Sequence, residues 1–223
     1  MLTRLDTVLY PDDIDVIHNT DIDQYVYPIF KCGYTSIVDY ARHYKFPFLT
    51  HKEIKECKEI SVIIRNPHER FISGVNSYYW NLHKQEPKLD RDTVFYFIKQ
   101  YPFFNRHYAP QIGWLINLFR FMNTNSRVKL LTMDNINDFT TLNSQPGNGE
   151  QKILTSNEIE DLQSSDTHQL YMRLDNKLLD MTGTSWTAQE LFTHLMTQDA
   201  EAYSECVAKN QVLTGVTDVL PKV

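Results

Sequence analysis

The stretch Tyr25–Tyr44, YVYPIFKCGYTSIVDYARHY, decides the expected fold of this chain. Its first six residues, YVYPIF, are mostly aromatic or β-branched, which predicts a short buried strand. Gly33 follows within a turn, where glycine readily takes a positive φ. Thr35 or Ser36 is expected to cap a helix whose apolar stripe runs towards Tyr44. The stretch therefore predicts a strand, a glycine turn and a helix.

A helix that begins directly after such a turn is suited to binding an anion. Its first backbone N–H groups have no partner within the helix, and its dipole favours negative charge there. Lys31 adds positive charge, and Thr35 and Ser36 add hydroxyl donors. A Walker A loop does not fit, because Lys31 precedes Gly33 instead of following a glycine. An ordinary strand–turn–helix unit without a ligand remains compatible with the same residues.

A second stretch repeats this arrangement. Ile60–Ile64, ISVII, is a continuous apolar run, typical of a central strand covered on both faces. It leads into Arg65 and Pro67, and a helix is expected from about residue 68 to 80. Strand, helix and strand in this order predict a parallel sheet with a right-handed crossover. Because ligands bind at the carboxyl ends of such strands, Lys31 and Arg65 are expected to face one ligand.

Composition narrows the class of protein. The 223 residues suffice for one domain with a sizeable core, and the net charge of -6 argues against general nucleic-acid binding. The three cysteines show no CxxC spacing, so neither a disulfide framework nor a zinc site is expected, and no other metal-ligand spacing stands out. The sequence has no apolar run of membrane-spanning length, so we expect a cytoplasmic location. The oligomeric state is not indicated.

The later part of the chain is expected to form a helix, a strand and then further helices. A buried helix is expected at Ile112–Met122 and a further strand at Val128–Thr132. Capping-box patterns at Thr155 and Thr187 predict helices at about 157–163 and 188–208.

The fold class expected from these elements is α/β. A central parallel sheet flanked by helices would form the core, at about residues 25–140. Helices at about 155–208 would cover it. The whole of residues 1–223 would then be a single domain.

Three segments of the sequence resemble those of a known family. Arg65–Ser73, RNPHERFIS, resembles the 3′-phosphate-binding signature of sulfotransferases that use 3′-phosphoadenosine 5′-phosphosulfate (PAPS), and is closest to the Arg-x-Pro-x-x-Arg-x-x-Ser pattern of the carbohydrate sulfotransferases. Phe30–Ser36, FKCGYTS, resembles their 5′-phosphosulfate loop. Asn105–Gln111, NRHYAPQ, is similar to a His-x-x-Pro-Gln segment in part of that family. The resemblance covers roughly residues 25–111 and implies a P-loop-like domain.

The resemblance also implies roles for individual residues. Lys31 would contact the 5′-phosphosulfate and stabilise the bridging oxygen as its bond to sulfur breaks. Arg65 and Ser73 would bind the 3′-phosphate, and Arg70 would support the loop through a salt bridge. The 5′-phosphosulfate site as a whole would comprise Lys31, Cys32, Gly33, Tyr34, Thr35 and Ser36.

The reaction implied is transfer of a sulfuryl group from PAPS to a hydroxyl of a carbohydrate or small-molecule acceptor, leaving 3′-phosphoadenosine 5′-phosphate (PAP). Such in-line transfer depends on positioning and charge stabilisation, and this scheme requires no metal. A general base would take the proton of the acceptor. The first candidate is His51, expected to leave the sheet at the same edge as Lys31 and Arg65. His107 is the second candidate and Glu53 the third.

Two other classes of protein stay open. One is a non-catalytic nucleotide-binding protein of the same fold, and the other is a divergent P-loop kinase. The polar segment Asn143–Lys152 is expected to be a loop, and equivalent loops in the resembled family close over the donor. Lys152 in it is either a phosphate ligand or a solvated lysine.

Overall fold

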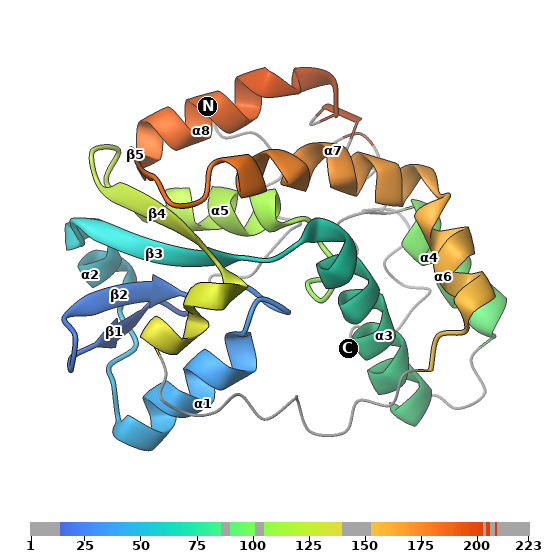
Figure 1. Ribbon diagram of the computed structural model, residues 1–223, viewed down its shortest axis with the longest axis horizontal. Helices are drawn as coiled ribbons and strands as arrows, with labels where there is room; N and C mark the ends of the chain where they lie inside the picture. Colours follow the sequence, from blue (N-terminus) through green and yellow to red (C-terminus); the bar gives the residue numbers. More distant parts are fainter. Residues whose placement is uncertain are drawn as a thin grey trace.

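The structure, a computed structural model, describes residues 14–85, 90–100, 105–139, 153–202, 204, 205 and 208. Five strands form one mixed sheet in the order β1-β2-β3-β4-β5 (Figure 1). The central strands β2, β3 and β4 are parallel, whereas β1 and β5 run antiparallel at the two edges. Their bounds are β1 Ile17–Asn19, β2 Gln24–Tyr27, β3 Glu59–Ile64, β4 Arg127–Thr132 and β5 Ser185–Thr187.

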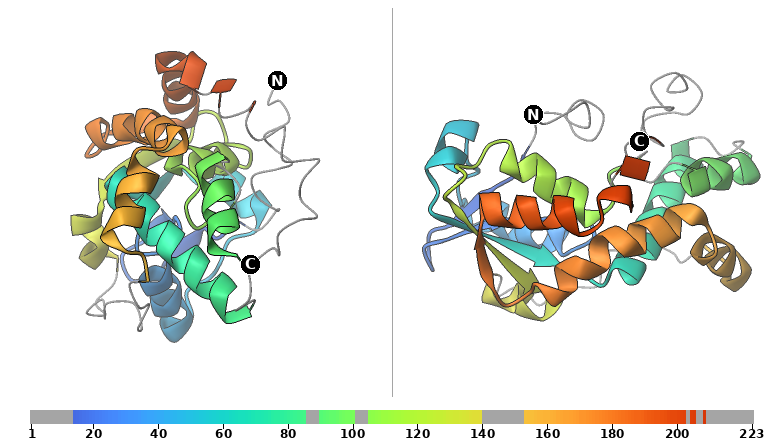
Figure 2. Two further views of the ribbon diagram at one scale, coloured as in Figure 1. Left: turned by 90° about the vertical axis from the view of Figure 1, so that its right-hand side faces the viewer. Right: turned by 90° about the horizontal axis from the view of Figure 1, so that it is seen from above.

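Helices cover both faces of this sheet and extend beyond one end of it. Figures 1 and 2 show α5, α7 and α8 over one face and α1 on the other, while α3, α4 and α6 lie beyond the carboxyl end of β3. The bounds are α1 Tyr34–Tyr44, α2 His51–Glu56, α3 Pro67–Gln85, α4 Arg91–Gln100, α5 Gln111–Phe119, η2 Met133–Asp138, α6 Ser156–Gln163, α7 Asp166–Asp180 and α8 Ala188–Gln198.

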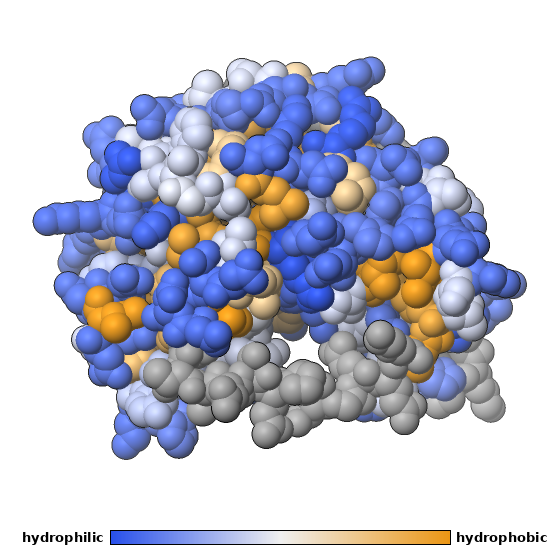
Figure 3. Space-filling view, viewed as in Figure 1, coloured by the Kyte–Doolittle hydropathy of each residue, from blue (hydrophilic) through white to orange (hydrophobic). Residues whose placement is uncertain are grey.

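The core has two parts. The larger cluster joins the sheet to α1, α5, α7 and α8, and the β3 residues Ile60, Val62, Ile63 and Ile64 are fully buried in it. The second cluster holds α3, α4, α6 and α7 together and includes Phe71 and Tyr171. In the view of Figure 3 the surface is mainly hydrophilic, and hydrophobic side chains gather only in separate small patches. The helices beyond the sheet thus have apolar packing of their own.

The prediction of an α/β fold with a sheet that is parallel at its centre is confirmed, with antiparallel strands added at both edges. The expected strands at 60–64 and 128–132 correspond to β3 and β4, and the expected helix at 157–163 corresponds to α6. The strand predicted over 25–30 is shorter, because β2 ends at Tyr27. Pro28 follows and has no N–H to donate to a strand ladder.

Other expectations are corrected by the structure. The residue that precedes α1 is Gly33, so the expected cap by Thr35 or Ser36 is wrong: both lie inside the first turn. The helix expected over 188–208 is interrupted: α8 ends at Gln198, Asp199 leaves the helical conformation, and residues 200–202, 204, 205 and 208 are helical again. The sequence did not predict α4, α7 or β5. Asn143–Lys152 lies outside the described residues, and so does Cys206.

None of the helices described in the structure is long and apolar enough to cross a membrane.

Candidate functional site

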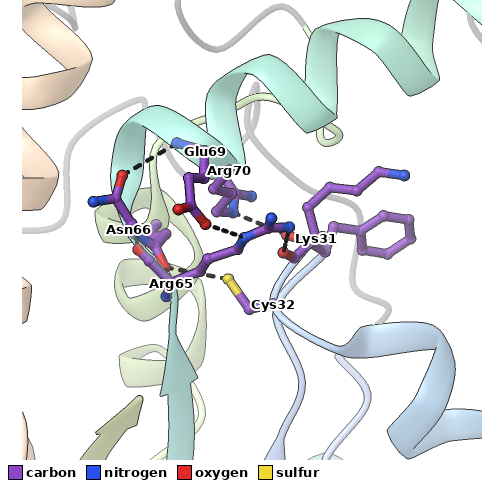
Figure 4. A network of polar contacts seen from close by, with 8 residues as sticks. Lys31, Cys32, Arg65, Asn66, Glu69 and Arg70 are labelled. Carbon is purple, nitrogen blue, oxygen red and sulfur yellow. Dashed lines mark hydrogen bonds and ion pairs between the residues drawn. The ribbon is translucent and has the colours of Figure 1, made fainter. Parts of the chain in front are cut away.

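The two sequence motifs meet at the carboxyl ends of neighbouring parallel strands. Lys31 follows β2, and Arg65 directly follows β3. The Arg65 guanidinium donates a hydrogen bond from Nη1 to the backbone oxygen of Lys31, over 3.3 Å (Figure 4). The expectation that these strand ends adjoin is therefore confirmed, although the two residues are thirty-four positions apart in the chain.

The loop between β2 and α1 is a tight turn with unusual backbone angles. The N–H of Cys32 donates to the carbonyl of Ile29 over 2.9 Å, which closes the turn. Lys31 has φ 65° and Gly33 has φ 79°, both in the left-handed region that non-glycine residues seldom adopt. A Cβ at Gly33 would also lie 2.3 Å from Cδ1 of Ile136. The positive φ thus favours glycine at position 33, and a Cβ there would also force the Ile136 side chain to shift.

The N-terminus of α1 opens at this loop. In the part of the chain that the structure describes, no side chain caps this helix, and its first turn carries no acidic residue. The neighbouring helix α3 differs, because the side-chain oxygen of Asn66 accepts a hydrogen bond from the N–H of Glu69 over 3.2 Å. Thr35 is exposed and Ser36 half-buried in the first turn of α1. This end of α1 therefore offers N–H groups and hydroxyls to an anion.

The Lys31 side chain runs along α3. Its ammonium group donates to the hydroxyl of Ser77 over 2.6 Å, and in Figure 4 it extends away from the Arg65 guanidinium. Ser73, the serine that the motif singles out, lies one turn earlier on α3 and is half-buried. Sequence reasoning missed Ser77. The available signal was its spacing of four residues from Ser73, which places both hydroxyls on one face of a helix.

Arg65 also has an acidic neighbour. Its Nε donates to Oε2 of Glu69 over 3.4 Å, and the two side chains are 30% and 60% exposed. Such an exposed pair is weak in water, so Glu69 holds the guanidinium loosely. A phosphate would compete for the same Arg65 donors.

Gln111, the first residue of α5, contacts both motifs. Its Oε1 accepts the N–H of Arg65 over 2.9 Å, and its Nε2 donates to the carbonyl of Arg65 over 3.0 Å. The same Oε1 accepts the thiol of Cys32 over 3.2 Å. Burial raises the pKa of Cys32 to about 11, so this thiol keeps its proton. No role was predicted for Gln111, although the His-x-x-Pro-Gln similarity ended on it.

Arg70 is fully buried and supports the loop between β2 and α1. Its Nε donates to the carbonyl of Phe30 over 2.9 Å, and its Nη1 donates to the carbonyl of Ala109 and to the hydroxyl of Tyr171. The predicted supporting role is confirmed, but backbone carbonyls and a tyrosine take the place of the expected salt-bridge carboxylate. Tyr171 comes from α7, which the sequence did not predict as a helix.

Asp175, also on α7, closes this buried cluster. Its two carboxylate oxygens accept the N–H groups of Gln111 and Ile112, over 2.6 and 3.0 Å, at the N-terminus of α5. Burial raises the pKa of Asp175 to about 6, and the nearby Arg70 charge and these N–H donors oppose the increase. The carboxylate is therefore mostly ionised at neutral pH and complements the dipole of α5.

The structure places His107 beside the Lys31 loop. The ring of His107 meets the ring of Phe30, the residue before Lys31, edge-on with 5.5 Å between centroids. Its Nδ1 lies 2.7 Å from the side-chain oxygen of Asn105, which also accepts the His107 N–H. A Cβ at Gly74 would lie 2.1 Å from the carbonyl oxygen of His107, so α3 packs directly on this backbone. The second base candidate thus adjoins the site.

His51 lies at the opposite end of the sheet, and its expected placement beside Lys31 and Arg65 is wrong. It opens α2, which ends just before β3 begins, whereas Arg65 follows the other end of β3. A strand of that length spans about 20 Å. The ring of His51 stacks on Phe121 with 4.0 Å between centroids.

Glu53, the third base candidate, shares the position of His51 at the amino end of β3. Its carboxylate accepts from both the N–H and the hydroxyl of Thr50, over 2.7 Å each, and so caps α2. The hydrogen bonds from the backbone and side chain of Thr50 lower the pKa of Glu53. The structure thus gives this carboxylate a capping contact far from the Lys31 loop.

Within the described ranges, no group of three or more His, Cys, Asp or Glu side chains is arranged to hold a metal ion. Lys152 lies outside those ranges. In comparisons with known proteins, no family model, no curated protein and no solved structure matches the chain.

Proposed function

We propose that this chain is a PAPS-dependent sulfotransferase that transfers a sulfuryl group to a hydroxyl of a carbohydrate or small-molecule acceptor. The observation that carries the proposal is the contact between the Arg65 guanidinium and the Lys31 carbonyl. It puts the guanidinium donors of Arg65 next to the N-terminus of α1, which no side chain caps. A nucleotide with separate phosphates on its 3′ and 5′ positions needs two such cationic sites side by side.

The donor would bind across the carboxyl ends of β2 and β3, in a P-loop-like arrangement of strand, loop and helix. The N-terminus of α1, from Cys32 to Ser36, would hold the 5′-phosphate through backbone N–H groups and hydroxyls. Arg65 would bind the 3′-phosphate with Ser73, whose helix begins next to it. Glu69 would give up its loose contact with Arg65 when the phosphate arrives.

In the transfer step, the acceptor oxygen would attack sulfur while the bond between sulfur and the bridging oxygen breaks. The electron pair of that bond goes to PAP, whose 5′-phosphate gains negative charge. The Lys31 ammonium, held at Ser77 along the same helix as Ser73, would swing to this oxygen and stabilise it. The proton of the acceptor hydroxyl would go to a base, so that atoms and charge balance.

We assign the role of base to His107 in place of His51. The support is position: His107 packs on Phe30, next to Lys31, whereas His51 lies at the other end of β3. When Nδ1–H of His107 donates to Asn105, the lone pair of the ring lies on Nε2, as a base requires.

Calorimetric titration with PAP and with AMP tests the donor site. PAP should bind in the micromolar range or tighter, and AMP much more weakly, because it lacks the 3′-phosphate. Arg65→Ala should cost about 1.5–3 kcal/mol of PAP binding and little of AMP binding. Equal affinities for the two nucleotides in the unchanged protein would contradict the assignment of Arg65 and Ser73.

A second assay separates an enzyme from a non-catalytic binding protein. The protein is incubated with PAPS carrying radiolabelled sulfate and with panels of sugars, glycans and small hydroxyl compounds. Label that moves to an acceptor, and is lost with Lys31→Ala, supports transfer. Tight binding of PAP with no transfer to any acceptor, under conditions where PAPS stays intact, would favour the binding protein.

A further inference from the structure

The carboxamide of Gln111 pairs with both backbone groups of one residue. It accepts from the N–H of Arg65 over 2.9 Å and donates to its carbonyl over 3.0 Å. A neighbouring strand would pair with a residue in the same way. Arg65 has just left β3, so these two bonds fix the direction in which its side chain leaves the sheet. The sheet itself supplies no further ladder contact there, because the register of β3 with β4 ends at Ile64.

The same carboxamide also reaches the other motif. Oε1 of Gln111 accepts the Cys32 thiol over 3.2 Å, and Cys32 is fully buried directly after Lys31. One oxygen atom therefore touches the backbone of Arg65 and the loop of Lys31. A side chain that contacts both motifs can set the distance between them.

Gln111 is itself held in place by α7. Asp175 accepts the backbone N–H of Gln111 over 2.6 Å and is fully buried. Burial raises the pKa of Asp175, and the buried charge of Arg70 opposes this increase. Arg70 also donates to the carbonyl of Phe30, on the other side of Lys31. Hydrogen bonds thus join the Lys31 loop to Gln111 and Gln111 to Asp175, while Arg70, whose charge acts on Asp175, bonds to the loop on its other side. A side chain anchored in this way has little freedom to adapt to its neighbours.

We propose that Gln111 is a positioning residue, which sets the Arg65 guanidinium at a fixed offset from the Lys31 loop so that the site selects a ligand by the separation of two phosphate groups. This rests on the proposed function, because it takes PAP and PAPS as the ligands of the two motifs. Gln111 itself would touch neither phosphate. Its effect would be on selectivity for the doubly phosphorylated nucleotide and not on the binding of a single phosphate.

The test compares Gln111→Ala and Gln111→Met with the unchanged protein. The methionine keeps the length of the side chain but makes no carboxamide hydrogen bonds. Asn117→Ala is the matched control, since Asn117 is a buried amide on the same helix whose side-chain oxygen accepts from Arg120. Circular dichroism and thermal unfolding establish that each variant is folded.

Two readouts need no ligand. Amide hydrogen exchange at Arg65 should accelerate about tenfold or more in both Gln111 variants, because its N–H loses its acceptor. The amide of Arg127, which donates to the carbonyl of Lys58 at the far end of β3, should be unaffected. Labelling of Cys32 by a small maleimide, mapped by peptide mass spectrometry, should also become faster. Asn117→Ala should change neither quantity.

The third readout is the ratio of the affinities for PAP and AMP. Both Gln111 variants should lower this ratio about tenfold or more, mainly by weakening PAP binding. A purely structural role would weaken both nucleotides together and leave the ratio unchanged.

The outcomes separate the two proposals. If the unchanged protein binds PAP and AMP equally, the proposed function is overturned, and this use of Gln111 with it. If the unchanged protein prefers PAP and both folded Gln111 variants keep that preference, only the positioning role is overturned. If both variants unfold while Asn117→Ala stays folded, Gln111 serves stability and the positioning role is likewise overturned.

Discussion

The ammonium group of Lys31 and the hydroxyl of Ser77 are joined by a hydrogen bond of 2.6 Å, between a loop after β2 and the middle of α3. Ser77 lies on the same helix as Ser73, the residue that we assign to the 3′-phosphate, and one helical turn beyond it. In the proposed reaction, this contact would be the resting position of a charge that is needed elsewhere only when the donor reacts. The contributions of Lys31 and Ser77 can therefore be tested separately by mutation.

Lys31→Ala should lower turnover far more than donor binding, because its charge matters most when the leaving oxygen becomes negative. Ser77→Ala should leave turnover within a few-fold of the unchanged protein, since it removes the resting contact and not the charge. Steady-state kinetics with PAPS, together with calorimetry with PAP, check both. A loss confined to donor affinity in Lys31→Ala would show that the lysine only holds the ground state.

Glu69→Gln should strengthen PAP binding. The substitution removes the carboxylate that pairs with Arg65 over 3.4 Å and keeps the size of the side chain. Because the pair is exposed, we expect a gain of about two- to fivefold, with no gain for AMP. Titration at low and at high salt checks the electrostatic origin. Weaker binding of PAP by Glu69→Gln would mean that Glu69 orients Arg65 for the ligand instead of competing with it.

Asp175→Asn should alter how stability depends on pH. Burial raises the pKa of Asp175 to about 6, above the value of an unfolded aspartate, and Arg70 opposes this increase. The folded protein therefore takes up a proton at Asp175 before the unfolded chain does. As pH falls from about 7 to about 4, the unfolding free energy of the unchanged protein should rise relative to that of Asp175→Asn by up to about 2–3 kcal/mol.

Urea unfolding of both proteins at matched pH values measures this difference. Carboxylates that are common to both proteins cancel in this difference in unfolding free energy. The capping Glu158 is one of them: burial alone would raise its pKa, but hydrogen bonds from Arg91 and Thr155 lower it. A difference that is constant over this range, or that falls with acidification, would contradict the raised pKa of Asp175.

The base is tested with His107→Ala and His51→Ala in parallel. His107→Ala should still bind PAP but lose turnover by about a hundredfold or more. His51→Ala serves as the control, because it removes a ring stacked on Phe121 at the far end of β3. Normal turnover in both variants would exclude a histidine base at either position. Loss of turnover in His51→Ala alone would restore the original assignment and contradict ours.

Parts of this structure were predictable because one residue type or one spacing determined them. The β-branched apolar run Ile60–Ile64 is typical of a buried strand, and Gly33 marks a backbone angle that few residues adopt. The adjacency of Lys31 and Arg65 then follows from strand order alone.

The misplacement of His51 was avoidable. The chain from His51 to Arg65 contains a short helix and then β3, which runs the length of the sheet towards Arg65. A residue before the start of a strand and a residue after its end lie at opposite edges of the sheet. The resemblance, which favoured a histidine in the segment between the two motifs, was the wrong guide.

The buried cluster could not be predicted, because its members are specified by tertiary partners. In α7 the buried face includes Thr167, His168 and Asp175, so the apolar periodicity of this helix is broken. Asp175 is tolerated there because the charge of Arg70 is nearby and two N–H groups of α5 meet its carboxylate. Nothing in the local sequence of α7 reveals that pairing, and Tyr171 and Gln111 were missed for the same reason.

The close approach of Gly74 to the carbonyl oxygen of His107 bears on how this protein could be redesigned. Because α3 packs directly on the backbone at position 107, the helix helps to hold that backbone in place. A mutant library that seeks new acceptor chemistry should therefore keep His107, the proposed base, and leave the backbone that carries it undisturbed. Position 74 is closed to variation, since a Cβ there would lie 2.1 Å from the carbonyl oxygen of His107 and 2.8 Å from Cα of Tyr108.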